Sequence, residues 1–173
     1  TLARDFNTRN TTFTGGLSYN KDEVDPVGGM PIGLSDTLLR ARTDSMGEKD
    51  VLEALLGVTQ VLNRNSLLQL NYTYGNDSGY LTDPYKLVSV VDAGGNPASI
   101  VHEKRPEDRT RHALYARTLT AFGRDVLHAS YRYYRDDWGV SAHTVDLRYR
   151  LQFSGGHYLE PQFRYSLQNS AAD

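Results

Sequence analysis

Hydrophobic and polar residues alternate with a period of two along most of this chain. The longest such stretch, residues 143–168, reads HTVDLRYRLQFSGGHYLEPQFRYSLQ and places apolar or aromatic residues at every second position on both sides of its SGG break. The residues between them are mostly charged or carry amides. Since successive side chains of a β-strand point to opposite faces, the pattern predicts two strands, each with one apolar and one polar face. The same alternation predicts three more strands, at 11–19, 67–74 and 126–134.

Two further segments have a less regular pattern. In residues 50–62 the apolar positions also fit one face of a helix, but the short NRNS turn that follows joins the segment to a predicted strand and favours a strand here too. Residues 112–122 have an ambiguous facing, because Tyr115 and Leu119 share a side with Arg117. A stub at Thr1 to Asp5 completes a prediction of about seven to eight strands.

The SGG break predicts a hairpin with a defined register. If these three residues form the loop, with glycine supplying the positive φ, Arg150 faces Glu160 and Asp146 faces Arg164. Apolar residues face apolar residues on the other side of the same hairpin. A shift by one residue would set every charge against an apolar neighbour, so both faces select one register.

The connections between the predicted strands alternate in length. RDFNTRN, NRNS, FGRD and SGG are short, whereas about 21–49 and 75–109 are long. Short turns at one end and long loops at the other are typical of transmembrane β-barrels, whose strands need about 9–11 residues to cross. The second long loop contains its own predicted hairpin, since YKLVSVV and ASIVHE flank the turn signal DAGGNP.

The composition agrees with a barrel and excludes several other classes. Only 39% of the residues are hydrophobic, with a mean hydropathy of -0.55, yet there are 12 tyrosines, which suit aromatic girdles at membrane interfaces. A net charge of -2 gives no basic field for nucleic acid. The absence of cysteine excludes disulfides, thiolate metal sites and a cysteine nucleophile. No apolar run approaches the length of a membrane-spanning helix.

The charged residues of the predicted polar faces are the candidate functional residues. In a barrel they line the interior, where they either bind an anionic solute and tune ion selectivity or pair across strands to fill a narrow lumen, and we favour pairing. No catalytic, metal or cofactor site is expected: Ser141 and His143 lack a nucleophile elbow, and Asp22, Glu23 and Asp25 lack the spacing of a calcium loop. The lumen-lining candidates are Arg132, Asp146, Arg148, Arg150, Glu160 and Arg164.

Several strings along the chain also carry a family resemblance. LARDFNTRNTTFTGGLSYNKDEVDPVGG, LLGVTQVLNRNSLLQLNYTYGNDSGYLTDPYKLVSVVD, RPEDRTRHALYAR and SYRYYRDDWGVSAHTVDLRYR resemble a family of uncharacterised bacterial outer-membrane β-barrel proteins, catalogued as a domain of unknown function. Members of that family are longer at both ends, so the resemblance implies that this chain is a fragment. It implies no catalytic residues, and it associates the family with redox partners.

These observations together predict an all-β, antiparallel up-and-down transmembrane β-barrel. Residues 1–173 would form one barrel domain with an incomplete set of strands, located in the bacterial outer membrane in contact with its lipid. The expected function is a pore or solute channel without enzymatic activity. Two alternatives remain: a barrel that acts as a scaffold or sheath for a lipoprotein or redox partner from the periplasm, and a soluble β-sandwich that acts as a binding module.

Overall fold

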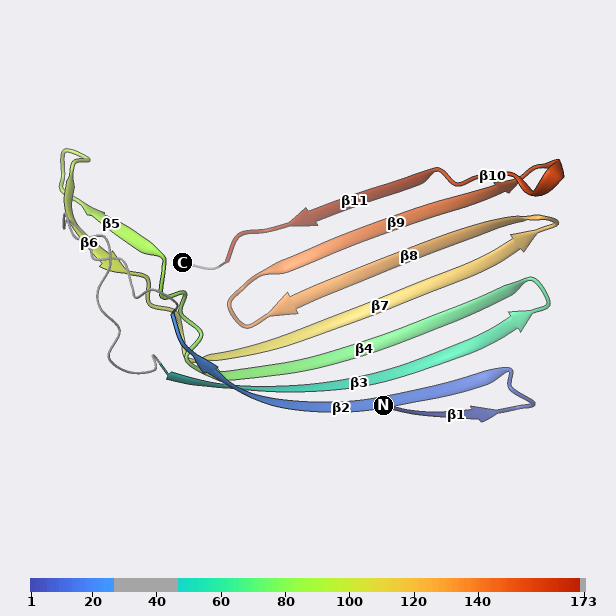
Figure 1. The fold of residues 1–173 in the computed structure, drawn as a ribbon, viewed down its shortest axis with the longest axis horizontal. Coiled ribbons are helices and arrows are strands. Elements are labelled where there is room, and N and C mark those ends of the chain that lie inside the picture. The colour runs from blue at the N-terminus through green and yellow to red at the C-terminus, as the bar shows by residue number, and fades with distance from the viewer. Residues whose placement is uncertain (27–46, 172–173) are drawn as a thin grey trace. The chain divides into compact units, whose positions relative to one another are not determined.

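The computed structural model describes residues 1–26 and 47–171 of the chain. Within them, β-strands account for most of the regular structure, there is no α-helix, and a single turn of 3₁₀-helix, η1 (Ser154–Gly156), is present. Figure 1 shows the strands in chain order. The chain forms two compact units, which are described separately: the first comprises residues 1–18, 53–75 and 110–173, and the second comprises residues 19–52 and 76–109.

Strands longer than those of an average globular protein make up the main sheet. β3 has 17 residues and β7 has 15, against a mean of about 5–6 residues. The described strands are β1 (Leu2–Phe6), β2 (Thr11–Val24), β3 (Gly47–Asn63), β4 (Ser66–Gly79), β5 (Leu87–Val91), β6 (Pro97–His102), β7 (Asp108–Phe122), β8 (Asp125–Asp136), β9 (Ser141–Gln152), β10 (Tyr158–Leu159) and β11 (Gln162–Gln168).

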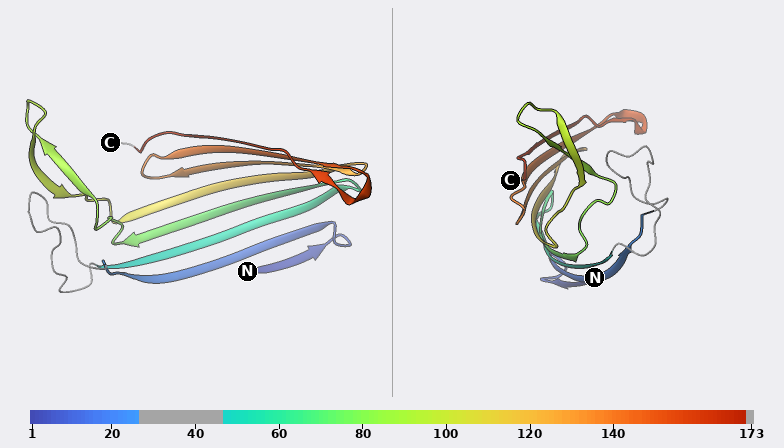
Figure 2. Two further views of the ribbon diagram at one scale, coloured as in Figure 1. Left: turned by 45° about the horizontal axis from the view of Figure 1, so that its top comes forward. Right: turned by 90° about the vertical axis from the view of Figure 1, so that its left-hand side faces the viewer.

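The main sheet is antiparallel and runs up and down in chain order. Its strands follow the order β1-β2-β3-β4-β7-β8-β9, and β10 and β11 both pair with β9. In the first unit these strands form a curved sheet that is open between β1 and β11 (Figure 2). The predicted all-β, up-and-down arrangement is therefore confirmed, whereas the sheet of the described residues is not closed as a barrel.

Both segments with an irregular pattern are strands. Residues 50–62 lie within β3 and residues 112–122 within β7, so the helix alternative for the first of them was wrong. Backbone pairing explains the result, because β3 and β7 lie inside the main sheet with a hydrogen-bonded strand on each side. A helix at either position would leave the facing amide and carbonyl groups of those neighbouring strands without partners.

The predicted hairpin register is confirmed. The amide of Phe153 donates to the carbonyl of His157 (2.9 Å), which closes a loop of the three SGG residues, and Gly155 and Gly156 have positive φ angles of 79° and 82°. The pairing places Asp146 opposite Arg164, Arg148 opposite Gln162, Leu147 opposite Phe163 and Leu151 opposite Leu159. The last strand is nevertheless split into β10 and β11, because Pro161, between them, has no amide hydrogen to continue the ladder.

The long connections are shorter than predicted. β2 continues to Val24 and β3 begins at Gly47, so both ends of the expected loop at 21–49 are strand, while residues 27–46 lie outside the described part. Charged residues in these extensions lie close to partners across the strands: Lys21 Nζ lies 2.7 Å from Glu48 Oε2. In the connection at 75–109, β4 continues to Gly79 before the chain leaves the main sheet.

The predicted hairpin inside the second long connection is confirmed. β5 and β6 pair as a separate two-stranded antiparallel sheet in the second unit. Their turn is fixed by Asp92, whose side-chain oxygen Oδ1 accepts hydrogen bonds from the amides of Gly94 (2.8 Å) and Asn96 (2.9 Å). Hydrogen bonds of this kind from an aspartate to nearby backbone amides are typical of tight turns.

In the first unit, the main sheet presents an apolar face that no other part of that unit covers. Among the described residues, no hydrophobic side chain is buried, and large apolar side chains are exposed along β1, β2, β3 and β7. The exposed fraction is 83% for Leu2, 74% for Leu17, 65% for Leu56 and 53% for Leu114. Within the described residues, we find no helix with the length and apolar character needed to cross a membrane.

Candidate functional site

All six sequence-predicted site residues lie on one face of the first unit. The registers of β7, β8, β9 and β11 place them opposite one another or at alternate positions, and the side chain of Glu160 reaches this face to contact Arg150. We call this the polar face. Its polar residues in this part of the sheet include Tyr115, Arg117, His128, Ser130, Arg132, Thr144, Asp146, Arg148, Arg150, Glu160, Gln162, Arg164 and Ser166, and Leu119 and Val126 lie among them.

Two carboxylates of the polar face are held by neighbouring side chains. Arg150 Nε lies 2.8 Å from Glu160 Oε2, as the sequence predicted. The second predicted pair, Asp146 with Arg164, is confirmed as a backbone pairing, but the Asp146 carboxylate contacts other residues. Its Oδ2 accepts a hydrogen bond from Gln162 Nε2 (2.6 Å), and its Oδ1 lies 3.3 Å from Arg148 Nε.

The polar face also contains two arginines that the sequence did not assign to it. Arg117 faces Ser130 across β7 and β8, and its Nη2 lies 3.1 Å from Nδ1 of His128. Arg111 Nη2 lies 3.2 Å from Glu53 Oε1, beside a depression of about 240 Å³ that Arg132 also lines. The alternation in β7 could not assign Arg117, because its side of the strand also carries a tyrosine and a leucine. The β7–β8 register assigns it.

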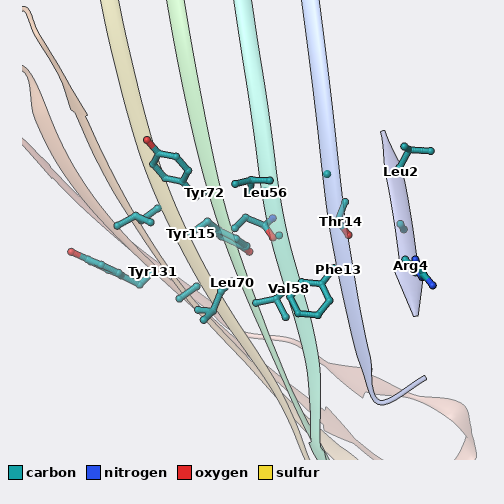
Figure 3. A pocket seen from close by; sticks show the side chains of 16 residues that line it. Leu2, Arg4, Phe13, Thr14, Leu56, Val58, Leu70, Tyr72, Tyr115 and Tyr131 are labelled. Atoms are coloured by element: carbon teal, nitrogen blue, oxygen red, sulfur yellow. The ribbon is translucent and has the colours of Figure 1, made fainter. Parts of the chain in front are cut away.

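The opposite side of the same strands is the apolar face. It consists of Leu114, Ala116, Ala129, Tyr131, Tyr133, His143, Val145, Leu147, Phe163, Tyr165 and Leu167 on β7, β8, β9 and β11. It continues across β2, β3 and β4, where Phe13, Leu56 and Leu70 line a broad, almost entirely apolar depression of about 900 Å³ (Figure 3). In this part of the sheet, most charges therefore lie on one face and most large apolar side chains on the other.

Two similar clusters of tyrosine and histidine lie on the apolar face, in the half of the strands nearer to the long connections. In the first, the Tyr72 hydroxyl is 2.7 Å from Nδ1 of His112, whose ring also approaches that of Tyr74. The second repeats the arrangement one strand pair away: the Tyr131 hydroxyl is 2.7 Å from Nδ1 of His143, and the centroid of that ring lies 5.0 Å from Tyr133. In each cluster one tyrosine hydroxyl and the histidine Nδ1 thus satisfy each other on a mostly apolar surface. We call these six residues, Tyr72, Tyr74, His112, Tyr131, Tyr133 and His143, the tyrosine–histidine belt.

The structure brings together no catalytic pair from Ser141 and His143. The hydroxyl of Ser141 lies 3.2 Å from Oδ1 of Asn169, whereas His143 is engaged with Tyr131. Nucleophilic catalysis requires a base within hydrogen-bond reach of the nucleophile, and these contacts point the two side chains to different partners. Across residues 1–26 and 47–171, no three histidine, aspartate or glutamate side chains are grouped closely enough to hold a metal ion.

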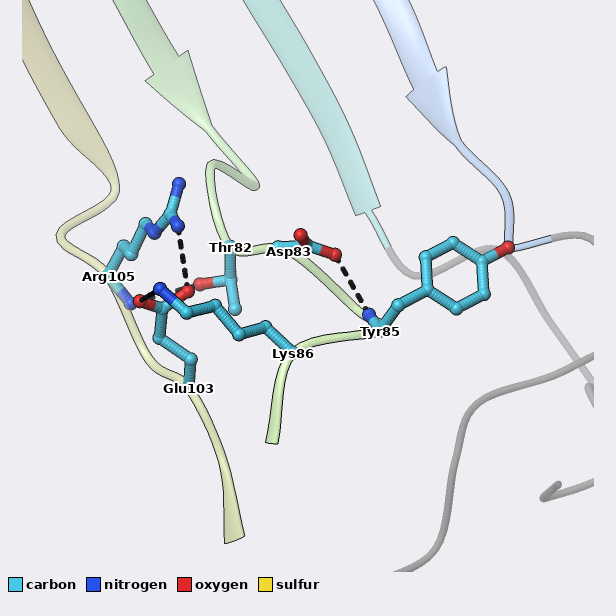
Figure 4. A network of polar contacts seen from close by, with 6 residues as sticks. All are labelled: Thr82, Asp83, Tyr85, Lys86, Glu103 and Arg105. Carbon is cyan, nitrogen blue, oxygen red and sulfur yellow. Dashed lines mark hydrogen bonds and ion pairs between the residues drawn. The ribbon is translucent and has the colours of Figure 1, made fainter. Parts of the chain in front are cut away.

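The second unit has a polar network of its own, beside a depression of about 550 Å³. Glu103 is its centre: its Oε1 lies 2.9 Å from Lys86 Nζ and its Oε2 lies 2.8 Å from Arg105 Nη2 (Figure 4). The amide of Arg105 donates to Thr82 Oγ1 (3.1 Å), and that of Tyr85 donates to Asp83 Oδ1 (2.9 Å). These contacts tie the base of the β5–β6 hairpin to the segment that leads into it.

Acid is expected to loosen this hairpin through Glu103. The hydrogen bond from Lys86, together with that from Arg105, holds the pKa of the Glu103 carboxyl below its ordinary range, against an opposing effect of burial. Because the folded pKa is the lower one, this stabilisation is present above the unfolded pKa of about 4.3 and is lost as the pH falls through the folded pKa. At pH 7 we expect amide hydrogen-exchange protection in β5 and β6 to be higher in the wild type than in Glu103→Gln.

This difference in protection should disappear at the acid end of the same titration. Protection factors are compared after correction for the intrinsic exchange rate at each pH. A difference between the wild type and Glu103→Gln that keeps its size from pH 7 down to pH 3 would show that the carboxylate charge of Glu103 does not hold the hairpin.

Comparisons with known proteins identify one family to which the sequence is similar. No curated protein and no solved structure matches the chain. The model of one protein family, described as "Protein of unknown function (DUF3570)", matches residues 1–173. Because this match extends over the whole sequence, the chain belongs to the DUF3570 family.

Proposed function

We propose that this chain forms the wall of a bacterial outer-membrane β-barrel that acts as a pore for small solutes. The observation that carries the proposal is the separation of the two faces: the apolar face is exposed, and the described residues bury no hydrophobic side chain. Soluble proteins place large apolar side chains inside a close-packed core. An apolar sheet face opposite a charged one fits a wall with lipid outside and water inside.

The length of the apolar face supports the same proposal. On β9 its positions run from His143, through Val145 and Leu147, toward Phe153, which is 53% exposed just beyond the end of the strand. Ten residue steps cover about 34 Å of strand. At a tilt of about 40°, this spans about 26 Å, close to the roughly 25 Å apolar band of outer-membrane barrels.

The tyrosine–histidine belt supports a membrane interface at one edge of that band. Tyrosine is enriched at the membrane–water interface, where its ring meets lipid and its hydroxyl meets polar groups. The belt repeats on β4 with β7 and on β8 with β9, as a girdle around a barrel would. A soluble β-sandwich would instead cover such a face with a second sheet, and in the described residues of the first unit every strand belongs to the main sheet.

Planar-bilayer recording tests this function. The protein is extracted from the outer-membrane fraction in mild detergent, checked for a heat-modifiable band on gels, and added to bilayers in potassium chloride. We expect stepwise conductance increases as single barrels insert. A protein that is heat-modifiable and inserted but carries no current is not a pore, and a lipoprotein that co-purifies with it would favour the scaffold alternative. Purification as a soluble protein without detergent would contradict the membrane barrel itself.

A further inference from the structure

We propose that Arg117, Arg132 and Arg164 on the polar face form a binding surface for small anions that carry carboxylate or phosphate groups. This inference rests on the proposed function in one respect, since it assigns anion selectivity to the same pore. The surface itself stands on the register and side-chain contacts of β7, β8, β9 and β11.

The strand registers gather five arginines in a small area of the polar face. One cross-strand row runs from Arg117 through Ser130 and Asp146 to Arg164. Arg132 and Arg148 lie in the rows on either side of it, two residues along their strands, and Arg150 lies one row further. Adjacent strands lie about 4.8 Å apart, so Arg117 and Arg164 stand about 14 Å apart in their row. Arg132 lies between them on β8, diagonal to Arg117 at about 7–8 Å, where both long side chains can reach the same bound group.

The carboxylates in this area are already engaged and do not balance the charge. Glu160 is paired with Arg150, and Asp146 is held by Arg148 and Gln162. Five guanidinium groups and two carboxylates leave a net charge of 5 − 2 = +3 on this part of the face. A wall that merely filled a narrow barrel with compensating pairs would not need this excess.

Three of the arginines retain open donor positions. Within the described residues, no carboxylate lies within ion-pair distance of Arg117, Arg132 or Arg164. The partner of Arg117 is Nδ1 of His128, at 3.1 Å, and a ring nitrogen that accepts from a guanidinium belongs to a neutral histidine, so the contact leaves the positive charge in place. Arg132 lies 5.9 Å from the ring centroid of Tyr134, a contact with its face that leaves its N–H edge open.

Guanidinium chemistry indicates which solutes this surface takes. The planar N–H fork of arginine matches the two oxygens of a carboxylate or phosphate and binds them bidentately. Surfaces lined by one sign of charge also raise the local concentration of counter-ions by about tenfold or more. The excess of arginine therefore favours anions twice, by general attraction and by specific binding.

Ion selectivity of the inserted protein is the first test. Reversal potentials are measured under a potassium chloride gradient for the wild type, for a triple variant with Arg117→Gln, Arg132→Gln and Arg164→Gln, and for the control Arg124→Gln, whose residue lies in the β7–β8 turn. We expect chloride to be favoured over potassium in the wild type and the control, and this preference to fall about tenfold in the triple variant. A wild-type preference for potassium, or a ratio that the triple variant leaves unchanged, would overturn the inference.

Phosphate binding in detergent is the second test, and it does not require a pore. Inorganic phosphate is titrated into the solubilised protein by calorimetry. We expect saturable binding that weakens at least about tenfold in the glutamine variant, because each open fork donates charge-assisted hydrogen bonds. A triple Arg→Lys variant keeps the charge without the fork, so it should retain chloride selectivity while losing phosphate affinity.

The two tests separate this inference from the proposed function. Phosphate binding without any conductance would support the anion-binding surface and contradict the pore. Conductance without chloride preference and without phosphate binding would support the pore and contradict the anion-binding surface. Gel mobility before and after heating shows that each variant is folded, and the lysine variant still decides the matter if the glutamine variant does not fold.

Discussion

Leu147→Arg is expected to lower the free energy of unfolding of the protein in a membrane by about 2–4 kcal/mol. Leu147 lies near the middle of β9 on the apolar face, between Ala129 and Phe163, and 39% of its surface is exposed. An arginine facing lipid at the bilayer midplane costs about 2–4 kcal/mol. Since whole domains are stable by only about 5–15 kcal/mol, this is a large fraction of the total. The measurement is the free energy of unfolding in lipid vesicles by denaturant titration, together with the amount of folded protein in the outer-membrane fraction.

Thr144→Arg is the matched control for this substitution. Thr144 lies three residues away on the same strand but on the polar face, where its hydroxyl contacts Ser166 (3.1 Å). In a membrane wall this side chain faces water, so we expect a free energy of unfolding close to that of the wild type. Equal losses in Thr144→Arg and Leu147→Arg would mean that lipid does not cover the apolar face.

Gly79→Ala should destabilise the second unit more than any other glycine substitution in its described residues. Gly79 ends β4 with a φ of +99°, and an added Cβ would lie 2.3 Å from the carbonyl oxygen of Glu48. That atom belongs to the backbone and also accepts the amide of Tyr80 (2.9 Å), so it cannot move without breaking this contact. Backbone strain alone costs about 1–3 kcal/mol, and the collision adds to it.

Trypsin cleavage at Lys86 and Lys104 under native conditions measures this effect, since opening of the second unit exposes both sites. We expect cleavage to accelerate strongly in Gly79→Ala. Two alanine variants separate the causes: Gly95→Ala adds a Cβ at a φ of +81° with no atom within 4 Å, and Gly15→Ala adds one in open space without a positive φ. Gly95→Ala should accelerate cleavage only through backbone strain. Gly15→Ala should leave the cleavage rate close to that of the wild type. Comparable cleavage rates in Gly79→Ala and Gly15→Ala would contradict the steric argument.

Much of the local structure could be predicted because a strand repeats with a period of two. The register of β9 with β11 follows from the residues alone, since a slip of one position would turn the apolar set of Leu147 and Phe163 toward the charged set of Asp146 and Arg164. The turns followed from the glycine, asparagine and aspartate residues that such turns require. The ends of the strands did not follow, because pairing across strands, as between Lys21 and Glu48, extends them past the last alternating apolar residue.

The sequence by itself determined that the chain is a set of antiparallel strands with one apolar and one charged face, because alternation and pairing are local properties. Only the tertiary structure decided which groups on a face meet. The β7–β8 register brought Arg117 onto His128, and the geometry between strands gave the Asp146 carboxylate to Gln162 and Arg148 instead of Arg164. Long side chains reach diagonal as well as opposite neighbours, so the choice of partner depends on the twist of the sheet and on distances between strands, which no linear pattern contains.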